Sequence, residues 1–251
     1  MRYAILADIH GNLEALDAVR SALAGERIDR HLCLGDLVGY GADPAACLAN
    51  IRALEAVVVG GNHDWGAIGK LDRAWFSDTA RTALEWTRDQ LSFGDLAWLR
   101  TLHLAQQDGP CTLVHGTLTR PERFEYLSDV AQALETARAL RTRYACVGHT
   151  HVPGVTEVDV GCSQVRRLIH DAAALTSGVA LEAAPSLRYV INPGSVGQPR
   201  DGDARASYAV LDEGARTLTI RRVTYDVAAA QRKIRAAGLP SILADRLAVG
   251  R

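Results

Sequence analysis

The sequence predicts an α/β fold, because short apolar runs rich in β-branched residues alternate with amphipathic stretches along most of the chain. The apolar runs are predicted strands, and in chain order they are Tyr3–Ala7, His31–Leu34, Ala56–Val59, Thr112–Val114, Ala145–Val147 and Arg188–Ile191. The chain has 251 residues, 48% of them apolar, which is enough for a sizeable core. With no repeat or obvious linker, residues 1–251 are predicted to form a single domain.

The amphipathic stretches between these runs are predicted helices, and they lie near Leu13–Leu23, Ala45–Leu54, Thr79–Leu91 and Val130–Arg141. Gly25 stands where the first of them should stop. Asp43 and Pro44 form an N-cap and first-turn pair at the start of the second. Helix and strand therefore alternate in the order that an α/β fold requires.

The second half of the chain is less regular. Residues 155–188 are expected to form strands and an irregular excursion on the substrate side of the fold. Ser207–Leu211 and Thr217–Val223 are predicted strands joined by a short turn. Two helical stretches are expected within residues 227–251.

Composition excludes several classes of protein. The 28 Lys and Arg residues nearly cancel the 29 Asp and Glu residues, so no basic field points to nucleic acid. No segment resembles a membrane span or a secretory leader, and we predict a cytoplasmic protein. The five cysteines contain no Cys-x-x-Cys pair and are expected to be reduced. The sequence leaves the oligomeric state open.

Polar side chains follow the first five predicted strands at the point where each strand ends. Ligands of α/β sheets bind beyond the carboxyl ends of the strands, so five strands should deliver these side chains to one rim. The candidate metal ligands in these clusters are Asp8, His10, Asp36, Asn62, His115, His149 and His151.

Seven ligands are too many for one tetrahedral ion but suit two divalent ions that share one carboxylate. Imidazole and carboxylate groups suit manganese, which we favour, and also iron, nickel, cobalt or zinc; the absence of thiolate argues against a structural zinc site. Two ions about 3.5–4 Å apart can hold a hydroxide and neutralise a phosphoryl group during in-line attack. The sequence therefore predicts a phosphoesterase that acts on a small phosphate ester.

Two of the clusters share one spacing, in which an Asp or a His is followed two positions later by a His. In an extended segment, side chains two positions apart point the same way. Asp8 and His10 should therefore reach one metal cluster together, as should His149 and His151.

His63 is expected to have a different role from the other histidines. Because Asn62 is a plausible neutral ligand, His63 is free to face the substrate. Asp64 is expected to orient it and to favour its protonated form. A protonated imidazole can donate its proton to a leaving alkoxide.

The ordered set of motifs resembles the calcineurin-like metallophosphoesterase superfamily over roughly residues 1–225. The motifs that carry the resemblance are Asp8-x-His10, Gly35-Asp36-x-x-Gly39-Tyr40-Gly41, Gly61-Asn62-His63-Asp64, His115-Gly116 and Gly148-His149-x-His151. The later run Asn192–Arg200 resembles the small bacterial and archaeal phosphodiesterase-like branch.

The resemblance implies a four-layer α/β/β/α sandwich with two metal ions at the strand ends. It assigns to the first ion the ligands Asp8, His10, Asp36 and His151. It assigns to the second ion the ligands Asp36, Asn62, His115 and His149, with Asp36 bridging. His63 would be the acid that contacts the phosphate, supported by Asp64.

Several alternatives stay open at this stage. The candidate substrate-binding residues are Arg120, Arg123, Arg200 and Tyr40, each of which has a surface or packing role as its alternative. The sequence does not separate phosphomonoesters from phosphodiesters. Rival functions are a protein Ser/Thr phosphatase, a nucleotide pyrophosphate hydrolase and a non-catalytic interaction scaffold.

Overall fold

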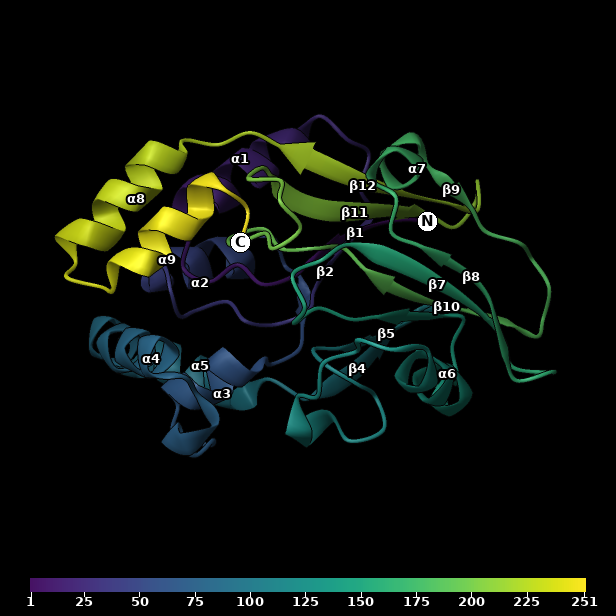
Figure 1. Cartoon of the computed structure of the whole chain (residues 1–251), viewed down its shortest axis with the longest axis horizontal. Coiled ribbons are helices and arrows are strands. Elements are labelled where there is room, and N and C mark those ends of the chain that lie inside the picture. The colour runs from purple at the N-terminus through teal and green to yellow at the C-terminus, as the bar shows by residue number, and fades with distance from the viewer.

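Two six-stranded sheets pack face to face in the computed structural model, which describes residues 1–251 apart from the side chain of Arg73 (Figure 1). The first sheet has the order β3 (Val57–Val58), β2 (Arg30–Cys33), β1 (Arg2–Leu6), β11 (Ala206–Asp212), β12 (Thr217–Val223) and β9 (Val179–Ala180). The second has the order β4 (Ala105–Asp108), β5 (Cys111–Val114), β6 (Tyr144–Cys146), β10 (Leu187–Asn192), β7 (Gly154–Asp159) and β8 (Gln164–Ile169).

The parallel strands decide where the site lies. β1, β2 and β3 run parallel in the first sheet, and β5, β6 and β10 run parallel in the second. Their carboxyl ends therefore gather at one edge of the sandwich.

From Tyr3 onward the central strand β1 is buried on both faces, which explains the apolar run Tyr3–Leu6. Tyr3 and Ile5 belong to the core between the two sheets. Ala4 and Leu6 point the other way, into the core beneath the helices. This alternation follows from the two-residue period of a strand.

Helices cover the outer faces of both sheets and complete the predicted four layers (Figure 1). α1 (Leu13–Ala24) and α2 (Pro44–Ala53) share a core with the first sheet, and α6 (Val130–Ala139) packs against the second. The remaining helices are α3 (Asn62–Ala67), α4 (Asp78–Gln90), α5 (Phe93–Thr101), α7 (Ala172–Ser177), α8 (Val227–Ala236) and α9 (Ser241–Asp245), with 3₁₀ turns at Arg73–Trp75, Pro121–Arg123 and Arg246–Ala248. α8 contacts α1 and α9.

Three elements do not follow from hydrophobic pattern. β4 has the polar sequence Ala-Gln-Gln-Asp, which a pattern of apolar residues cannot reveal. α5 buries only Leu99 completely, but Ser92 and Asp95 form a capping box that marks its start. α3 begins at a candidate ligand, Asn62, and lacks an apolar stripe.

The segment 155–188 is mainly an edge of the second sheet. β7 pairs with β10 so that Gly154 lies beside Asn192 at the carboxyl edge, and the strand then runs away from that edge. The turn between β7 and β8 therefore lies at the far end, and only the end of β8 returns toward the carboxyl edge.

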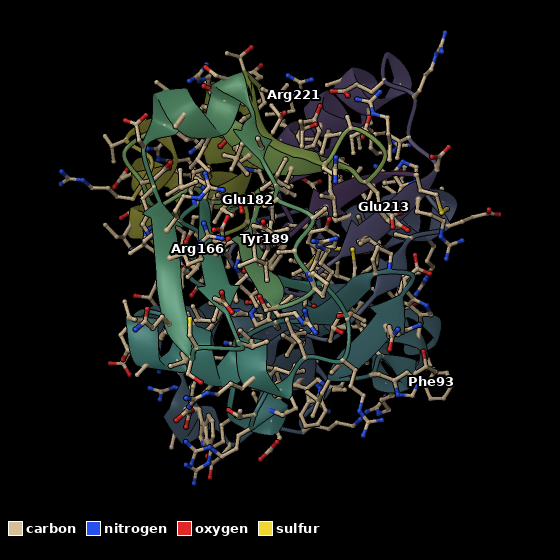
Figure 2. The ribbon with its side chains drawn as sticks, turned by 90° about the vertical axis from the view of Figure 1, so that its right-hand side faces the viewer. Phe93, Arg166, Glu182, Tyr189, Glu213 and Arg221 are labelled. Carbon is tan, nitrogen blue, oxygen red and sulfur yellow. The ribbon has the colours of Figure 1, made fainter. Side chains whose placement is uncertain are left out.

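Charged side chains protect this edge of the sheet (Figure 2). Arg166 on β8 makes ion pairs with Glu182, at 3.1 Å, and with Glu157, at 3.5 Å. Paired charges on an edge strand disfavour pairing with another chain.

All five cysteines are free thiols, and only Cys162 is exposed. Within the described residues, no helix combines the length and the apolar character that crossing a membrane would require.

Candidate metal centre

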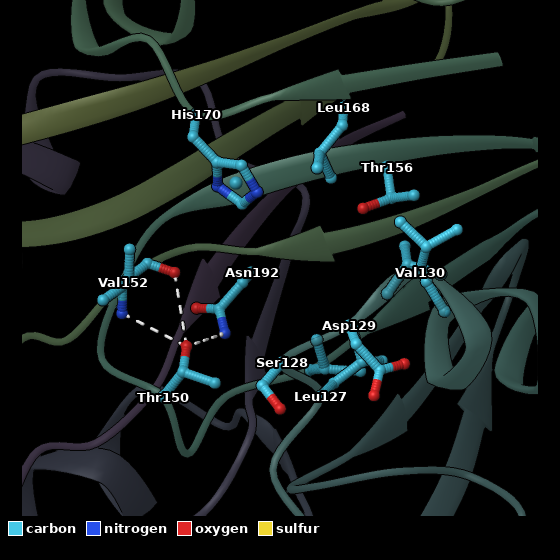
Figure 3. A pocket seen from close by; sticks show the side chains of 14 residues that line it. Leu127, Ser128, Asp129, Val130, Thr150, Val152, Thr156, Leu168, His170 and Asn192 are labelled. Atoms are coloured by element: carbon cyan, nitrogen blue, oxygen red, sulfur yellow. Dashed lines mark hydrogen bonds between the residues drawn. The ribbon is translucent and has the colours of Figure 1, made fainter. Parts of the chain in front are cut away.

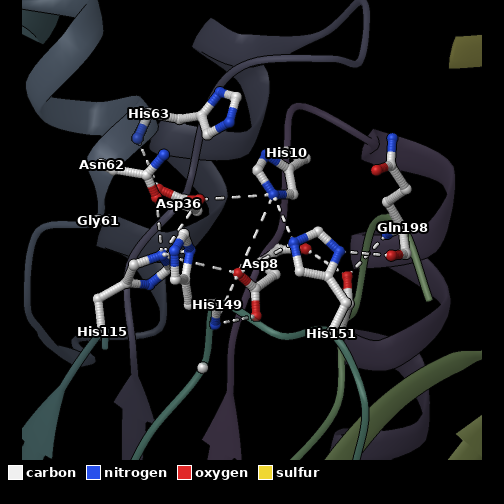
Figure 4. Close-up of polar contacts among 12 residues, drawn as sticks. Asp8, His10, Asp36, Gly61, Asn62, His63, His115, His149, His151 and Gln198 are labelled. Atoms are coloured by element: carbon white, nitrogen blue, oxygen red, sulfur yellow. Dashed lines mark hydrogen bonds and ion pairs between the residues drawn. The ribbon is translucent and has the colours of Figure 1, made fainter. Parts of the chain in front are cut away.

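The structure brings together all seven predicted ligands, which come from the carboxyl edge of both sheets (Figure 4). Six of them are 7% exposed or less, and Asn62 is half-buried. Polar and charged groups that are buried to this extent need hydrogen-bond partners, ion-pair partners or a metal ion.

The first group of donor atoms surrounds Asp8. The Nε2 atoms of His10 and His151 are 3.2 Å apart. Oδ1 of Asp8 lies 3.4 Å from Nε2 of His151 and 4.0 Å from Nε2 of His10. The three side chains therefore face one common point.

The second group surrounds His115. Its Nε2 lies 3.1 Å from Oδ1 of Asn62, 3.1 Å from Nδ1 of His149 and 3.2 Å from Oδ2 of Asp36. The same Oδ2 of Asp36 lies 3.6 Å from Nε2 of His10, in the first group. Asp36 is thus the carboxylate that both groups share.

These spacings fit bound cations. Two ligand atoms that each lie about 2.1 Å from one ion, at right angles, are about 3.0 Å apart. Imidazole, carboxylate and amide donor atoms held at these distances in a dry pocket, with no thiolate among them, fit a pair of borderline or hard divalent ions. The seven ligand residues therefore suit the pair of divalent ions that the sequence predicts.

Backbone carbonyl groups fix the orientation of three histidines. Nδ1 of His10 lies 3.1 Å from the carbonyl oxygen of Val38, and Nδ1 of His115 lies 2.7 Å from that of Leu34. Nδ1 of His151 lies 2.6 Å from the carbonyl oxygen of Gln198. An N–H donated from Nδ1 leaves Nε2 free to act as a ligand.

Five of the seven ligands have a left-handed backbone, which corrects the expectation of extended segments. β1 ends at Leu6, and Asp8 and His10 have φ values of 54° and 49°. His149 and His151 have φ values of 69° and 60°. Such non-glycine conformations cost free energy, and they cluster at functional sites. Here they turn each pair of side chains toward the cluster.

The cluster retains protons when no cation is bound. Burial raises the pKa of Asp8 to about 7. Burial lowers the pKa of His115, but the Asp36 carboxylate outweighs it and raises that pKa to about 9. Cations that bind here must therefore displace protons.

His63 lies beside the ligands but is not oriented by an acid. Its ring packs edge-on against His10, with centroids 4.8 Å apart, and its backbone N–H donates to Oδ1 of Asp36 at 2.8 Å. Its Nδ1 has no hydrogen-bond partner among the described residues, and a Cβ at Gly39, where φ is +88°, would overlap it. Burial lowers the pKa of His63 to about 4.

Asp64 does not make the expected contact with His63. Its Oδ2 accepts the backbone N–H groups of Asp36 and Gly61 at 2.8 and 2.9 Å. Its Oδ1 accepts that of Leu37 at 2.9 Å. The carboxylate therefore joins the loops that carry Asp36 and Asn62, and it does not hold His63 in a protonated form.

The four candidate substrate-binding residues divide into two sets. Arg200 and Tyr40 line a cavity of about 180 Å³ together with Asp36, Asn62 and His63. Arg123 lines only the adjoining cavity, and both Arg120 and Arg123 are paired with Glu125 on the surface.

A larger cavity of about 280 Å³ lies beside the centre (Figure 3). Val130, Leu168 and other apolar side chains form most of its wall. Thr150, which stands between His149 and His151, accepts an N–H from Asn192 at 3.0 Å there. The ligands themselves lie outside this cavity.

Sequence reasoning missed several residues that support the centre. The main-chain oxygens of Val38, Leu34 and Gln198 have no side-chain signature. Tyr126 stacks on His149 with ring centroids 4.0 Å apart, and nothing in its local sequence marks it. In the sequence, Gly39 indicates the space that His63 occupies, because a Cβ at this position would overlap the His63 ring.

The fold and the site define an α/β/β/α sandwich with a candidate centre for two divalent ions. The chain belongs to the calcineurin-like phosphoesterase superfamily, whose domain profile matches residues 1–216.

Three relatives illustrate this membership. A metallophosphoesterase from Sphaerobacter thermophilus is 41% identical, with a TM-score of 0.85 over 100% of this chain and 99% of that one. An uncharacterised protein of Methanocaldococcus jannaschii is 36% identical over 99% of this chain and 98% of its own length. A symmetrical bis(5'-nucleosyl)-tetraphosphatase of Chromohalobacter salexigens is 36% identical over 55% of this chain and 52% of its own length.

Proposed function

We propose that this protein is a phosphoesterase that hydrolyses phosphomonoesters or phosphodiesters at a centre of two divalent ions. The observation that carries the proposal is the position of Asp36, whose Oδ2 lies 3.2 Å from His115 and 3.6 Å from His10. One carboxylate shared by two ligand groups is the arrangement that a pair of ions needs.

The ligand assignment follows the two groups of donor atoms. Asp8, His10 and His151 would hold the first ion; Asn62, His115 and His149 would hold the second; Asp36 would reach both. When bound, the two ions would lower the pKa of a water molecule and offset the charge of the phosphate.

The chain's own residues would bind and orient the ester. His63 would direct a ring N–H at the phosphate or its leaving oxygen, and the charge of a bound phosphate would raise the depressed pKa of this histidine. Arg200, which lines the same cavity, would hold an anionic oxygen of the substrate.

Manganese is our proposed metal and a small phosphate ester our proposed partner. The complete donor set argues against a non-catalytic scaffold. The similarity to a bis(5'-nucleosyl)-tetraphosphatase favours nucleotide pyrophosphate bonds as the second candidate substrate. We propose a cytoplasmic location, as the sequence predicted.

The test is a substrate panel assayed with added manganese. It would contain p-nitrophenyl phosphate, bis-p-nitrophenyl phosphate, cyclic nucleotides, dinucleoside polyphosphates and phosphopeptides. Metal-dependent turnover of the esters supports the proposal, and turnover of phosphopeptides alone would favour a protein phosphatase. Metal-loaded protein that hydrolyses none of them would overturn it.

A further inference from the structure

Two arginines from distant parts of the chain share one neutral hydrogen-bond acceptor beside the metal centre. Arg200 donates to Oε1 of Gln198 at 3.0 Å, and Arg246 donates to the same atom at 3.2 Å. Gln198 lies next to His151, whose Nδ1 contacts its carbonyl oxygen (Figure 4). Arg246 belongs to the C-terminal region beyond residue 216, where the superfamily profile ends.

Neither guanidinium forms an ion pair with an acid among the described side chains. The two acids closest in sequence to Arg200 are engaged elsewhere, since Asp201 pairs with Arg222 and Asp203 pairs with Arg205. The Nε atoms of both Arg200 and Arg246 are buried without a hydrogen-bond partner. Two N–H donors in this position lack the acceptor that buried polar groups normally have.

The pair is electrostatically unfavourable as it stands. Like charges that meet on one neutral oxygen repel each other, and burial together with the charge of Arg200 lowers the pKa of Arg246. An oxyanion between two guanidinium groups would remove the repulsion and supply acceptors for their free donors.

The position of Arg200 ties the pair to the proposed reaction. Arg200 lines the cavity of about 180 Å³ that also contains Asp36 and His63, and its guanidinium lies 5.9 Å from the ring centre of Tyr40. An anion at this pair would therefore be a neighbour of the phosphate at the metal centre.

We propose that Arg200 and Arg246 together bind a second anionic group of the substrate, a phosphate or a carboxylate, adjacent to the phosphate that is hydrolysed. This inference rests on the proposed function for the location of that first phosphate. It makes Arg246 a specificity-determining residue that the family's motifs do not contain.

The experiment compares three non-hydrolysable probes on the manganese-loaded protein. Methylphosphonate carries one anionic group, phosphonoacetate adds a carboxylate, and methylenediphosphonate adds a second phosphonate. Binding is measured by calorimetry at fixed manganese, and inhibition of bis-p-nitrophenyl phosphate hydrolysis is measured in parallel. Calorimetry gives a result even if no ester is hydrolysed, so this inference and the proposed function can fail separately.

We expect a two-anion probe to bind about tenfold or more tightly than methylphosphonate, because each charged hydrogen bond contributes on that scale. Arg246→Gln should bring the ratio close to one, and Arg246→Lys should restore part of it. Arg205→Gln is the matched control, since Arg205 is paired with Asp203, and it should keep the full ratio. Whichever of the two longer probes binds more tightly shows whether the second group is phosphonate-like or a carboxylate.

Chelation of manganese by the diphosphonate affects every variant equally, so the comparison between variants decides the result. An equal ratio in the wild type, Arg246→Gln and Arg205→Gln would overturn the inference, as would a wild-type ratio of one. If Arg246→Gln fails to fold by circular dichroism, Arg200→Gln takes its place in the same comparison.

Discussion

Nε2 of His115 lies 3.2 Å from Oδ2 of Asp36, at the point where the two groups of candidate ligands meet. β5 positions the histidine and β2 positions the acid, so this contact joins the two sheets. A cluster that joins the sheets in this way links metal binding to the packing of the whole sandwich.

Replacement of Asp36 by Asn should disrupt both ion sites, because one carboxylate oxygen is shared between them. Metal bound per chain should fall by more than one ion, and turnover should fall by more than about 100-fold. Elemental analysis of purified protein measures the metal. Asp17→Asn, an exposed change on α1, is the control and should retain both ions.

Replacement of His63 by Ala should preserve metal content and reduce turnover. A general acid typically contributes 10²- to 10⁴-fold, so kcat should fall by about that much. The measurement pairs steady-state kinetics with elemental analysis. Loss of metal in proportion to activity would show that His63 is a ligand, contrary to its proposed role.

Replacement of Asp64 by Asn should lower the free energy of unfolding by about 2–3 kcal/mol, because an amide N–H₂ would then face backbone N–H donors. Those donors belong to Asp36, Leu37 and Gly61. Chemical denaturation of the metal-free protein measures the effect. An unchanged stability accompanied by a large fall in kcat would support the contact with His63 that this structure lacks.

Affinity for manganese should increase with pH between about 6 and 9. In the metal-free protein the pKa of Asp8 is raised to about 7, and that of His115 to about 9, so both hold protons below these values. Cations compete with those protons, and each proton displaced strengthens binding by up to about tenfold per pH unit. Titrations at pH 6.5, 7.5 and 8.5 measure the slope; an affinity independent of pH would contradict these shifts.

The location of the centre could be predicted from the sequence, because it follows from the order and direction of the strands. Parallel strands that end in Asp8, Asp36, His115 and His149 must deliver these side chains to one edge. The local backbone conformation could not be predicted in this way, because the left-handed backbone at His10 depends on hydrogen bonds from distant loops.

Long-range partners explain the remaining differences. Asp64 was expected to serve His63, its neighbour in sequence, but its oxygens accept N–H groups from a loop 26 to 28 positions away. Arg246 lies 48 positions from Gln198, and no spacing of residues in the sequence indicates that contact. Contacts of this kind arise from packing and are visible only in the folded chain.

The most direct measurement is anomalous scattering from crystals grown with manganese. A centre of two ions predicts two peaks about 3.5–4 Å apart, with Asp36 bound to both ions and His63 bound to neither. A single peak, or density away from Asp36, would contradict it.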